Sequence, residues 1–139
     1  MKLKAAISDN LSEELVKKLN GIRQQILVQV LVPHLKVPED WGPTQFFVQN
    51  CDVCDAKTHG MFVHVTLSGV SLTDDRADND FSRARDEIEG IYGEVIAEHL
   101  PKGETCEITV IIMLDKPLRN GDSIVEEDEP ANIEGTLEE

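Results

Sequence analysis

The sequence has little positive charge and no long apolar run. It holds 13 Lys and Arg against 27 Asp and Glu, for a formal net charge of −14. Contacts to phosphate groups need clustered Lys and Arg, so this composition argues against a nucleic-acid partner. No apolar stretch approaches the ~20 residues that a membrane-spanning helix needs. Residues 1–10, MKLKAAISDN, also lack the apolar core of a signal peptide. We therefore expect a cytoplasmic protein without a nucleic-acid or membrane partner.

Cysteine is also scarce, with three in 139 residues. Cys51 and Cys54 lie in the stretch CDVCDAKTHG, together with His59. A structural zinc site normally takes four thiolate or imidazole ligands, whereas this run offers three and has no second C-x-x-C. A redox pair normally opens a helix, but this pair lies between two predicted strands, beside Asp52 and Asp55, whose charges raise the pKa of a nearby thiol. We expect a turn or loop without chemistry, and no bound metal or cofactor, with a zinc site and a redox pair as the alternatives.

The remaining composition is that of a globular domain followed by an acidic end. Hydrophobic residues make up 40% of the chain, which is enough to build one domain with a real core. The last 18 residues hold eight acids and no base. We expect residues 1–120 to form an α+β domain and residues 121–139 to form an acidic tail in solvent. A tail that docks is the alternative.

Apolar spacing predicts two long helices and four strands. The apolar residues that recur with helical spacing are Leu15, Leu19, Ile22, Ile26 and Val30 in the first helix, which Pro33 ends or kinks, and Phe81, Ala84, Ile88, Ile91 and Val95 in the second. Strands are predicted at 1–7, 44–50, 61–67 and 105–115, the last of them apolar enough for burial on both faces. The order is therefore β-α-β-β-α-β, in two β-α-β units with parallel strands. The sheet face that the helices do not cover needs a partner, and a second copy of the chain is the simplest one.

Three short stretches resemble one enzyme superfamily. SDNL at 8–11 and FVHVTL at 62–67 look like the corresponding stretches of the 5-carboxymethyl-2-hydroxymuconate isomerase family. LKVPEDW at 35–41 looks like the link into the second strand of 4-oxalocrotonate tautomerase relatives. Residues 1 to about 117 thus resemble the tautomerase superfamily. A ferredoxin-like regulatory domain has the same element order and is the alternative.

The resemblance implies a fold, an assembly and a chemistry. The element order gives a four-stranded sheet with two helices on one face. The resemblance implies a homotrimer with its sheets packed around a central axis, and an active site at the start of the first strand. The family's base is an N-terminal proline that shuttles a proton between carbon and oxygen of a 2-oxo or 2-hydroxy acid. Here Met1 stands in that place, and Lys2 is bulky enough to prevent removal of the methionine. The expected base is the α-amine of Met1, since α-amines are partly neutral near pH 7.

The other candidate residues would hold a small acid. The family binds substrate carboxylates with arginines, and neither SDNLSEE at 8–14 nor WGPTQFF at 41–47 contains one. Lys2, which shares a strand face with Lys4, is the candidate source of positive charge.

Three further residues are candidate substrate contacts, namely Trp41, Phe46 and His64; roles in the core or at the sheet face are the alternatives for them. The sequence favours a divergent tautomerase, with a non-catalytic oligomeric binding or scaffold protein of the same fold as the alternative.

Overall fold

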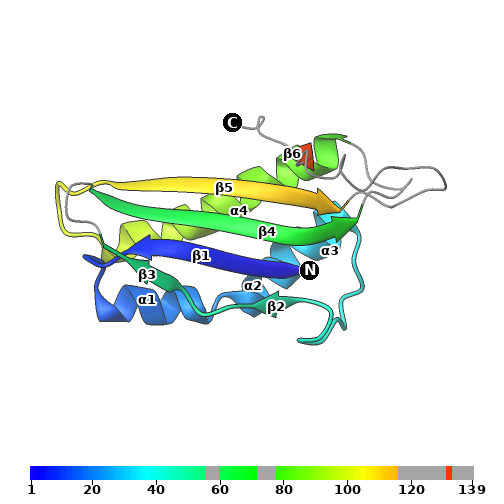
Figure 1. Ribbon diagram of the computed structural model, residues 1–139, viewed down its shortest axis with the longest axis horizontal. Helices are drawn as coiled ribbons and strands as arrows, with labels where there is room; N and C mark the ends of the chain where they lie inside the picture. Colours follow the sequence, from blue (N-terminus) through cyan, green and yellow to red (C-terminus); the bar gives the residue numbers. More distant parts are fainter. Residues whose placement is uncertain (56–59, 72–77, 116–130, 133–139) are drawn as a thin grey trace.

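The computed structural model describes residues 1–55, 60–71, 78–115 and 131–132. The strands are β1 (Lys2–Ser8), β2 (Phe47–Val48), β3 (Asp52–Cys54), β4 (Met61–Ser71), β5 (Cys106–Asp115) and β6 (Ala131–Asn132). The helices are α1 (Glu13–Asn20), α2 (Arg23–Ile26), the π-helix η1 (Leu27–Leu31), α3 (Val32–Leu35) and α4 (Asp78–His99). All strands belong to one mixed sheet (Figure 1).

The strand order separates the two folds that share this element order. The sheet runs β2-β1-β4-β5-β6, and β3 also pairs with β1. Both β2 and β3 are parallel to β1, β4 is antiparallel to β1, and β5 is parallel to β4. Strands joined by a helix are thus direct neighbours, whereas a ferredoxin-like split β-α-β unit places another strand between them. The ferredoxin-like alternative therefore does not fit.

The predicted four-stranded sheet is wrong in detail, because the second strand is split in two. We predicted one strand over residues 44–50 and a turn over the cysteine stretch, but β2 covers only two residues and β3 lies in the cysteine stretch. Between them, the Cys51 N–H donates a 2.9 Å hydrogen bond to the side-chain oxygen of Asn20 on α1 instead of to β1. This contact takes one residue out of the ladder, so the tandem β-α-β pattern is irregular in its first half.

The first predicted helix is also broken into segments. Ser12 caps α1 by accepting a 3.2 Å hydrogen bond from the Leu15 N–H, and the helix ends at Gly21. Pro33 does not end the later segments, which continue to Leu35. In the π-helix before it, the Val32 N–H bonds to the Leu27 carbonyl, five residues back. This wider turn accommodates a proline ring that would clash with a carbonyl in a regular α-helix.

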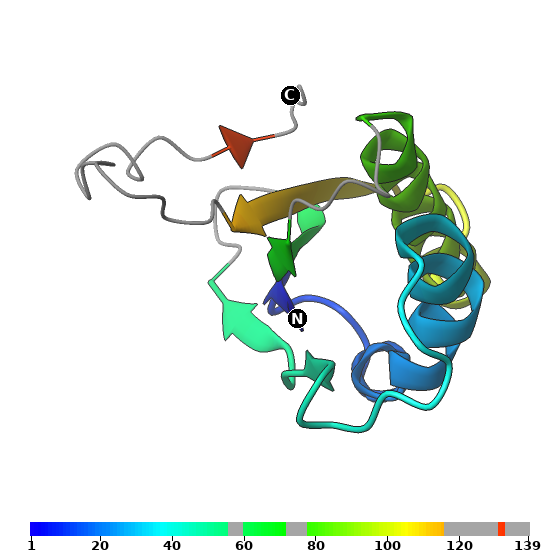
Figure 2. The ribbon, with the colours of Figure 1, turned by 90° about the vertical axis from the view of Figure 1, so that its right-hand side faces the viewer.

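The helices all lie on one side of the sheet (Figure 2). The core between the two layers contains Leu3, Ala5 and Ile7 of β1, Val63, Val65 and Leu67 of β4, Val110 and Ile112 of β5, and Phe81, Ala84 and Ile88 of α4. The strand predicted at 61–67 is confirmed as part of β4, in which buried Val63, Val65 and Leu67 alternate with exposed or half-buried residues.

Among the described residues, no helix or strand covers the sheet face away from the helices, here called the open face. Alternation and register assign to it Lys2, Lys4 and Ala6 of β1, Phe47 of β2, Phe62, His64, Thr66 and Ser68 of β4, and Thr109, Ile111 and Met113 of β5. Phe47 is 48% exposed and Met113 41% exposed. The burial predicted for both faces of β5 is thus reached on only one face of the single chain.

Part of the predicted acidic tail pairs with the sheet. Ala131 and Asn132 form β6, antiparallel to Leu114 and Met113 of β5. The other residues of 121–139 lie outside the described residues, so a solvent-exposed tail stays a prediction for them. Within the described parts of the chain, no helix combines the length and the apolar character needed to cross a membrane.

Candidate functional site

The N-terminal residue is held at the start of β1, an interior strand of the sheet, by two backbone hydrogen bonds. The α-amine of Met1 donates a 2.8 Å hydrogen bond to the carbonyl oxygen of Gln45, and this contact is exposed to solvent. The Met1 carbonyl in turn accepts a 3.1 Å hydrogen bond from the Phe47 N–H. The segment 36–46 before β2, here called the connector, therefore fixes the direction of the amine while leaving it reachable from solvent.

A β-bulge in β4 lies directly beside this amine. The register of β4 and β5 pairs Leu67 with Ile112 and then Val70 with Leu114, so two residues of β4, Ser68 and Gly69, stand opposite one residue of β5. Gly69 has a φ of +75°, and a Cβ there would lie 3.4 Å from the Met1 Cα and 3.6 Å from its nitrogen. Bulges are over-represented next to active sites, where they re-aim the chain. The glycine keeps the space beside the amine free of a side chain.

Arg23 on α2 secures the connector from the other side. Its Nε donates a 2.9 Å hydrogen bond to the Phe46 carbonyl, and its Nη2 donates one of 2.9 Å to the Trp41 carbonyl. Its guanidinium carbon also lies 5.5 Å from the centroid of the Phe46 ring. Sequence analysis did not find this arginine, because it lies outside the three short stretches on which the resemblance rests and no local pattern links it to residues 41–46. Both hydrogen bonds go to backbone carbonyls, so Arg23 positions the connector.

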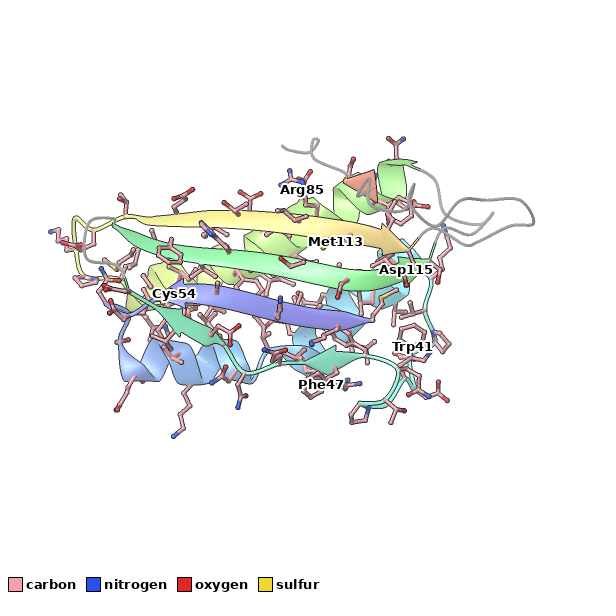
Figure 3. All side chains as sticks on the ribbon, viewed as in Figure 1. Trp41, Phe47, Cys54, Arg85, Met113 and Asp115 are labelled. Carbon is pink, nitrogen blue, oxygen red and sulfur yellow. The ribbon has the colours of Figure 1, made fainter. Side chains whose placement is uncertain are left out.

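The two aromatic candidates, Trp41 and Phe46, differ in burial and in location. Phe46 is 0% exposed and belongs to the core, which is the alternative that the sequence left open for it. Trp41 is half-buried, packs at the edge of the core and belongs to the connector near the N-terminus (Figure 3). Lys2 is exposed on the open face, in register with Phe47 and Ser68.

His64 lies away from the N-terminal site of its own chain. It pairs with Ala6, and at ~3.3 Å per strand residue that position is about 17 Å along β1 from Met1. Its ring centroid is 4.8 Å from that of Phe62, and its Nε2 is 3.8 Å from a carboxylate oxygen of Glu107. The histidine is therefore a neighbour of these open-face side chains and not of the amine.

The two cysteines of the C-x-x-C stretch point to opposite faces of the sheet. Cys54 pairs with Ser8 in β3, while Cys51 precedes β3 and packs against the core. Side chains three residues apart in extended chain project to opposite faces, which excludes a disulfide between these two thiols or a metal held by both. Burial, with a further contribution from Asp52, raises the pKa of the Cys51 thiol. Its nucleophilic thiolate form is thereby disfavoured. No cluster of three or more metal-ligating side chains occurs among the described residues, which do not include His59.

Comparison with known proteins gives a fold but no sequence relative. No protein-family model matches the chain, and no curated protein is detectably similar to it. Fused 4-OT in a symmetric trimer matches with a TM-score of 0.52 and 10% identity, covering 90% of this chain and 97% of its own. This chain has the fold of the tautomerase superfamily. Native fused 4-OT also gives a TM-score of 0.52, at 8% identity, over 93% of this chain and 100% of its own. Pt0534 inactivated by 2-oxo-3-pentynoate matches with a TM-score of 0.51 and 12% identity, covering 91% of this chain and 99% of its own.

Proposed function

We propose that this protein is a proton-transfer enzyme that interconverts the keto and enol forms of a small 2-oxo acid, with the Met1 amine as its base. The observation that carries the proposal is the solvent-exposed amine at the start of β1, oriented by the Gln45 carbonyl beside the Ser68–Gly69 bulge. The substrate class is supported by Pt0534, a protein of the same fold that was inactivated by 2-oxo-3-pentynoate, which is itself a 2-oxo acid.

The proposed step moves one proton and needs no cofactor. The lone pair of the neutral amine takes a proton from C3 of the 2-oxo acid, and the C–H bonding electrons move into the enolate. The ammonium then returns the proton to oxygen, which gives the enol, or to carbon. The Gln45 carbonyl accepts one amine N–H throughout and so holds the direction of the amine.

Lys2 and Trp41 are the proposed substrate contacts. Lys2 directly follows the base and is exposed, so its ammonium can pair with the substrate carboxylate. Trp41 would give an apolar wall from the connector. Phe46 and His64 are left out, because Phe46 is fully buried and His64 lies about five residues along β1 from the amine.

We further propose that the chain assembles into a homotrimer through the open face. Phe47 and Met113 expose large apolar side chains on that face, and fused 4-OT of the same fold forms a trimer. Within the superfamily, SDNL at 8–11 and FVHVTL at 62–67 favour the 5-carboxymethyl-2-hydroxymuconate isomerase family as the nearest functional type.

A non-catalytic oligomeric binding or scaffold protein is the second candidate. One specific observation favours it: two cavities lined by described residues lie at the far end of β1, around Ser8 to Leu11, away from Met1. In that case the fold is kept for assembly and the amine has no substrate.

The deciding experiment follows deuterium exchange into C3 of phenylpyruvate by NMR. Intact mass first establishes that Met1 is the N-terminal residue. Native protein should exchange slowly, and faster as pH rises, because only the neutral amine accepts a proton.

Two variants change the position or type of the amine. A Gly-Ser extension before Met1 moves the amine and should abolish exchange. A proline inserted after Met1, exposed once methionine is removed, should increase it. An unchanged rate in the extended protein would show that Met1 is not the base, and no exchange in any form would favour the second candidate.

A further inference from the structure

A cavity of about 670 Å³ lies at the far end of β1, between α1 and β3. Its volume is within the ~300–1,000 Å³ that small-molecule sites occupy. The lining begins at Ile7 and Ser8, so at ~3.3 Å per strand residue the cavity is about 20 Å along β1 from Met1. Figure 3 shows the same separation, with Cys54 of β3 and Trp41 of the connector at opposite ends of the molecule. The cavity is therefore separate from the proposed active site and does not depend on it.

The inner walls of this cavity are apolar. Ile7 is fully buried at its base, and Leu11 and Val16 are half-buried at its sides. Val53 pairs with Ile7 in register, which places it on the helix side of the sheet, yet it is 61% exposed. It is more exposed than any other large apolar side chain among the described residues. An apolar ligand seated here would remove Val53 and Leu11 from water, which is favourable in proportion to the area covered.

The rim of the cavity is acidic. Asp9, Glu13 and Glu14 line it, against the single cation Lys17. Glu13 and Glu14 stand in the first turn of α1, where the helix dipole already favours carboxylates. Neither of them forms an ion pair with Lys17 within the described parts of the chain. The net charge of −14 adds a negative field over the whole surface. The rim thus disfavours anions and attracts cations.

We propose that this cavity binds a small amphipathic cation, with its apolar body against Leu11, Val16 and Val53 and its ammonium group facing Glu13 and Glu14. The apolar walls and the acidic rim select different parts of one ligand. A carboxylate of the same shape meets repulsion at the rim, and an inorganic cation gains nothing from the walls.

The test uses the full chain and three probes of one shape: 2-phenylethylammonium, 3-phenylpropanoate and 2-phenylethanol. Methyl NMR spectra should show saturable shifts at Leu11, Val16 and Val53 with the ammonium. The carboxylate should bind about tenfold more weakly or not at all, because it exchanges an attraction for a repulsion. Equal affinity for the carboxylate, or no saturable shift with the ammonium, would overturn the proposal.

Charge variants then locate the ammonium group. The double variant Glu13→Gln and Glu14→Gln should weaken ammonium binding about threefold and leave 2-phenylethanol unaffected, since an exposed ion pair contributes modestly. Lys17→Gln should strengthen ammonium binding. The matched control is Glu94→Gln with Glu98→Gln, two exposed glutamates of α4 that do not line the cavity. If the control weakens binding as much as the double variant, general surface charge explains the effect and the proposed site is wrong.

Discussion

The α-amine of Met1 and the backbone carbonyl oxygen of Gln45 are joined by a 2.8 Å hydrogen bond across 44 residues of sequence. The next residue, Phe46, has its own carbonyl bonded to Arg23 on α2. Amine, connector and helix are therefore linked in series, and the position of the amine depends on a side chain that never touches it.

We expect Arg23→Met to destabilise the fold. It leaves the Phe46 and Trp41 carbonyls without their charged donor, and hydrogen bonds to charged groups are worth about 1.5–3 kcal/mol. Arg23→Lys should fall between wild type and Arg23→Met, because one ammonium cannot reproduce the guanidinium fork. Urea unfolding measures the change. Lys18→Met, which removes an exposed cation from α1, is the control and should change the free energy of unfolding by less than about 0.5 kcal/mol. Equal losses in the two methionine variants would contradict the role given to Arg23.

Two glycines with positive φ allow the bulge to be tested separately from backbone strain. Gly69 and Gly103 have φ of +75° and +87°, so alanine at either position should cost about 1–2 kcal/mol of stability. A Cβ at Gly103 meets nothing within 4 Å, whereas one at Gly69 approaches the Met1 nitrogen. Only Gly69→Ala should therefore slow the carbamylation of the Met1 amine by cyanate, followed by mass spectrometry. If both variants react at the wild-type rate, the bulge does not control access to the amine.

The regular parts of the fold follow from local patterns, and the irregular parts do not. The strand pattern at 61–67 predicted β4, and the 3–4 spacing predicted α4, because each pattern repeats within one element. The break between β2 and β3 depends on Cys51 bonding to Asn20, 31 residues earlier. Nothing within the strand itself indicates such a contact.

In the candidate site, too, the features with a local sequence signal were predictable, and those that depend on tertiary contacts were not. The place of Met1 came from a resemblance near the chain's start, and in the structure its amine makes a solvent-exposed hydrogen bond to Gln45 at the start of β1. Arg23 was missed because its partners at residues 41 and 46 are brought to it only by the tertiary fold. The bulge did have a local signal, since Gly69 interrupts an apolar strand pattern, and an isolated glycine there suggests a bulge.

Cys51 should react slowly with alkylating agents. Burial and the charge of Asp52 raise the pKa of its thiol, so at any pH below the folded-state value less thiolate is present than in the unfolded chain. Iodoacetamide labelling at pH 8, resolved by peptide mass spectrometry, should be slower at Cys51 in folded protein than in protein unfolded by urea. The same shift favours folding below the ordinary thiol pKa, and this stabilisation is lost as pH rises through the raised one. Labelling of Cys51 at equal rates in folded and unfolded protein would contradict the predicted protection.

The same cysteine stretch should form neither an internal disulfide nor a metal site. Cys51 and Cys54 project to opposite faces at the edge of the sheet. Mild oxidation followed by peptide mapping without reductant should yield no Cys51–Cys54 linkage, and protein purified without chelator should carry well under one zinc per chain. A stoichiometric zinc content would make the stretch a ligand set and contradict the expected absence of metal.

The last prediction concerns assembly through the open face. Exposed apolar side chains lie on this face, and a similarly exposed one on the helix layer provides a control. Phe47 and Met113 are 48% and 41% exposed on the open face, and Val28 of η1 is 42% exposed on the opposite layer. If the open face mediates assembly, wild-type protein should sediment at three times its 15.5 kDa chain mass.

Phe47→Lys or Met113→Lys would place a charge inside the interface, where removing it from water costs several kcal/mol, and should give monomers. Val28→Lys makes the same chemical change at the same exposure and should leave the trimer intact. Dissociation by Val28→Lys would move the interface to the helix layer, and a monomeric wild type would show that the open face stays in water.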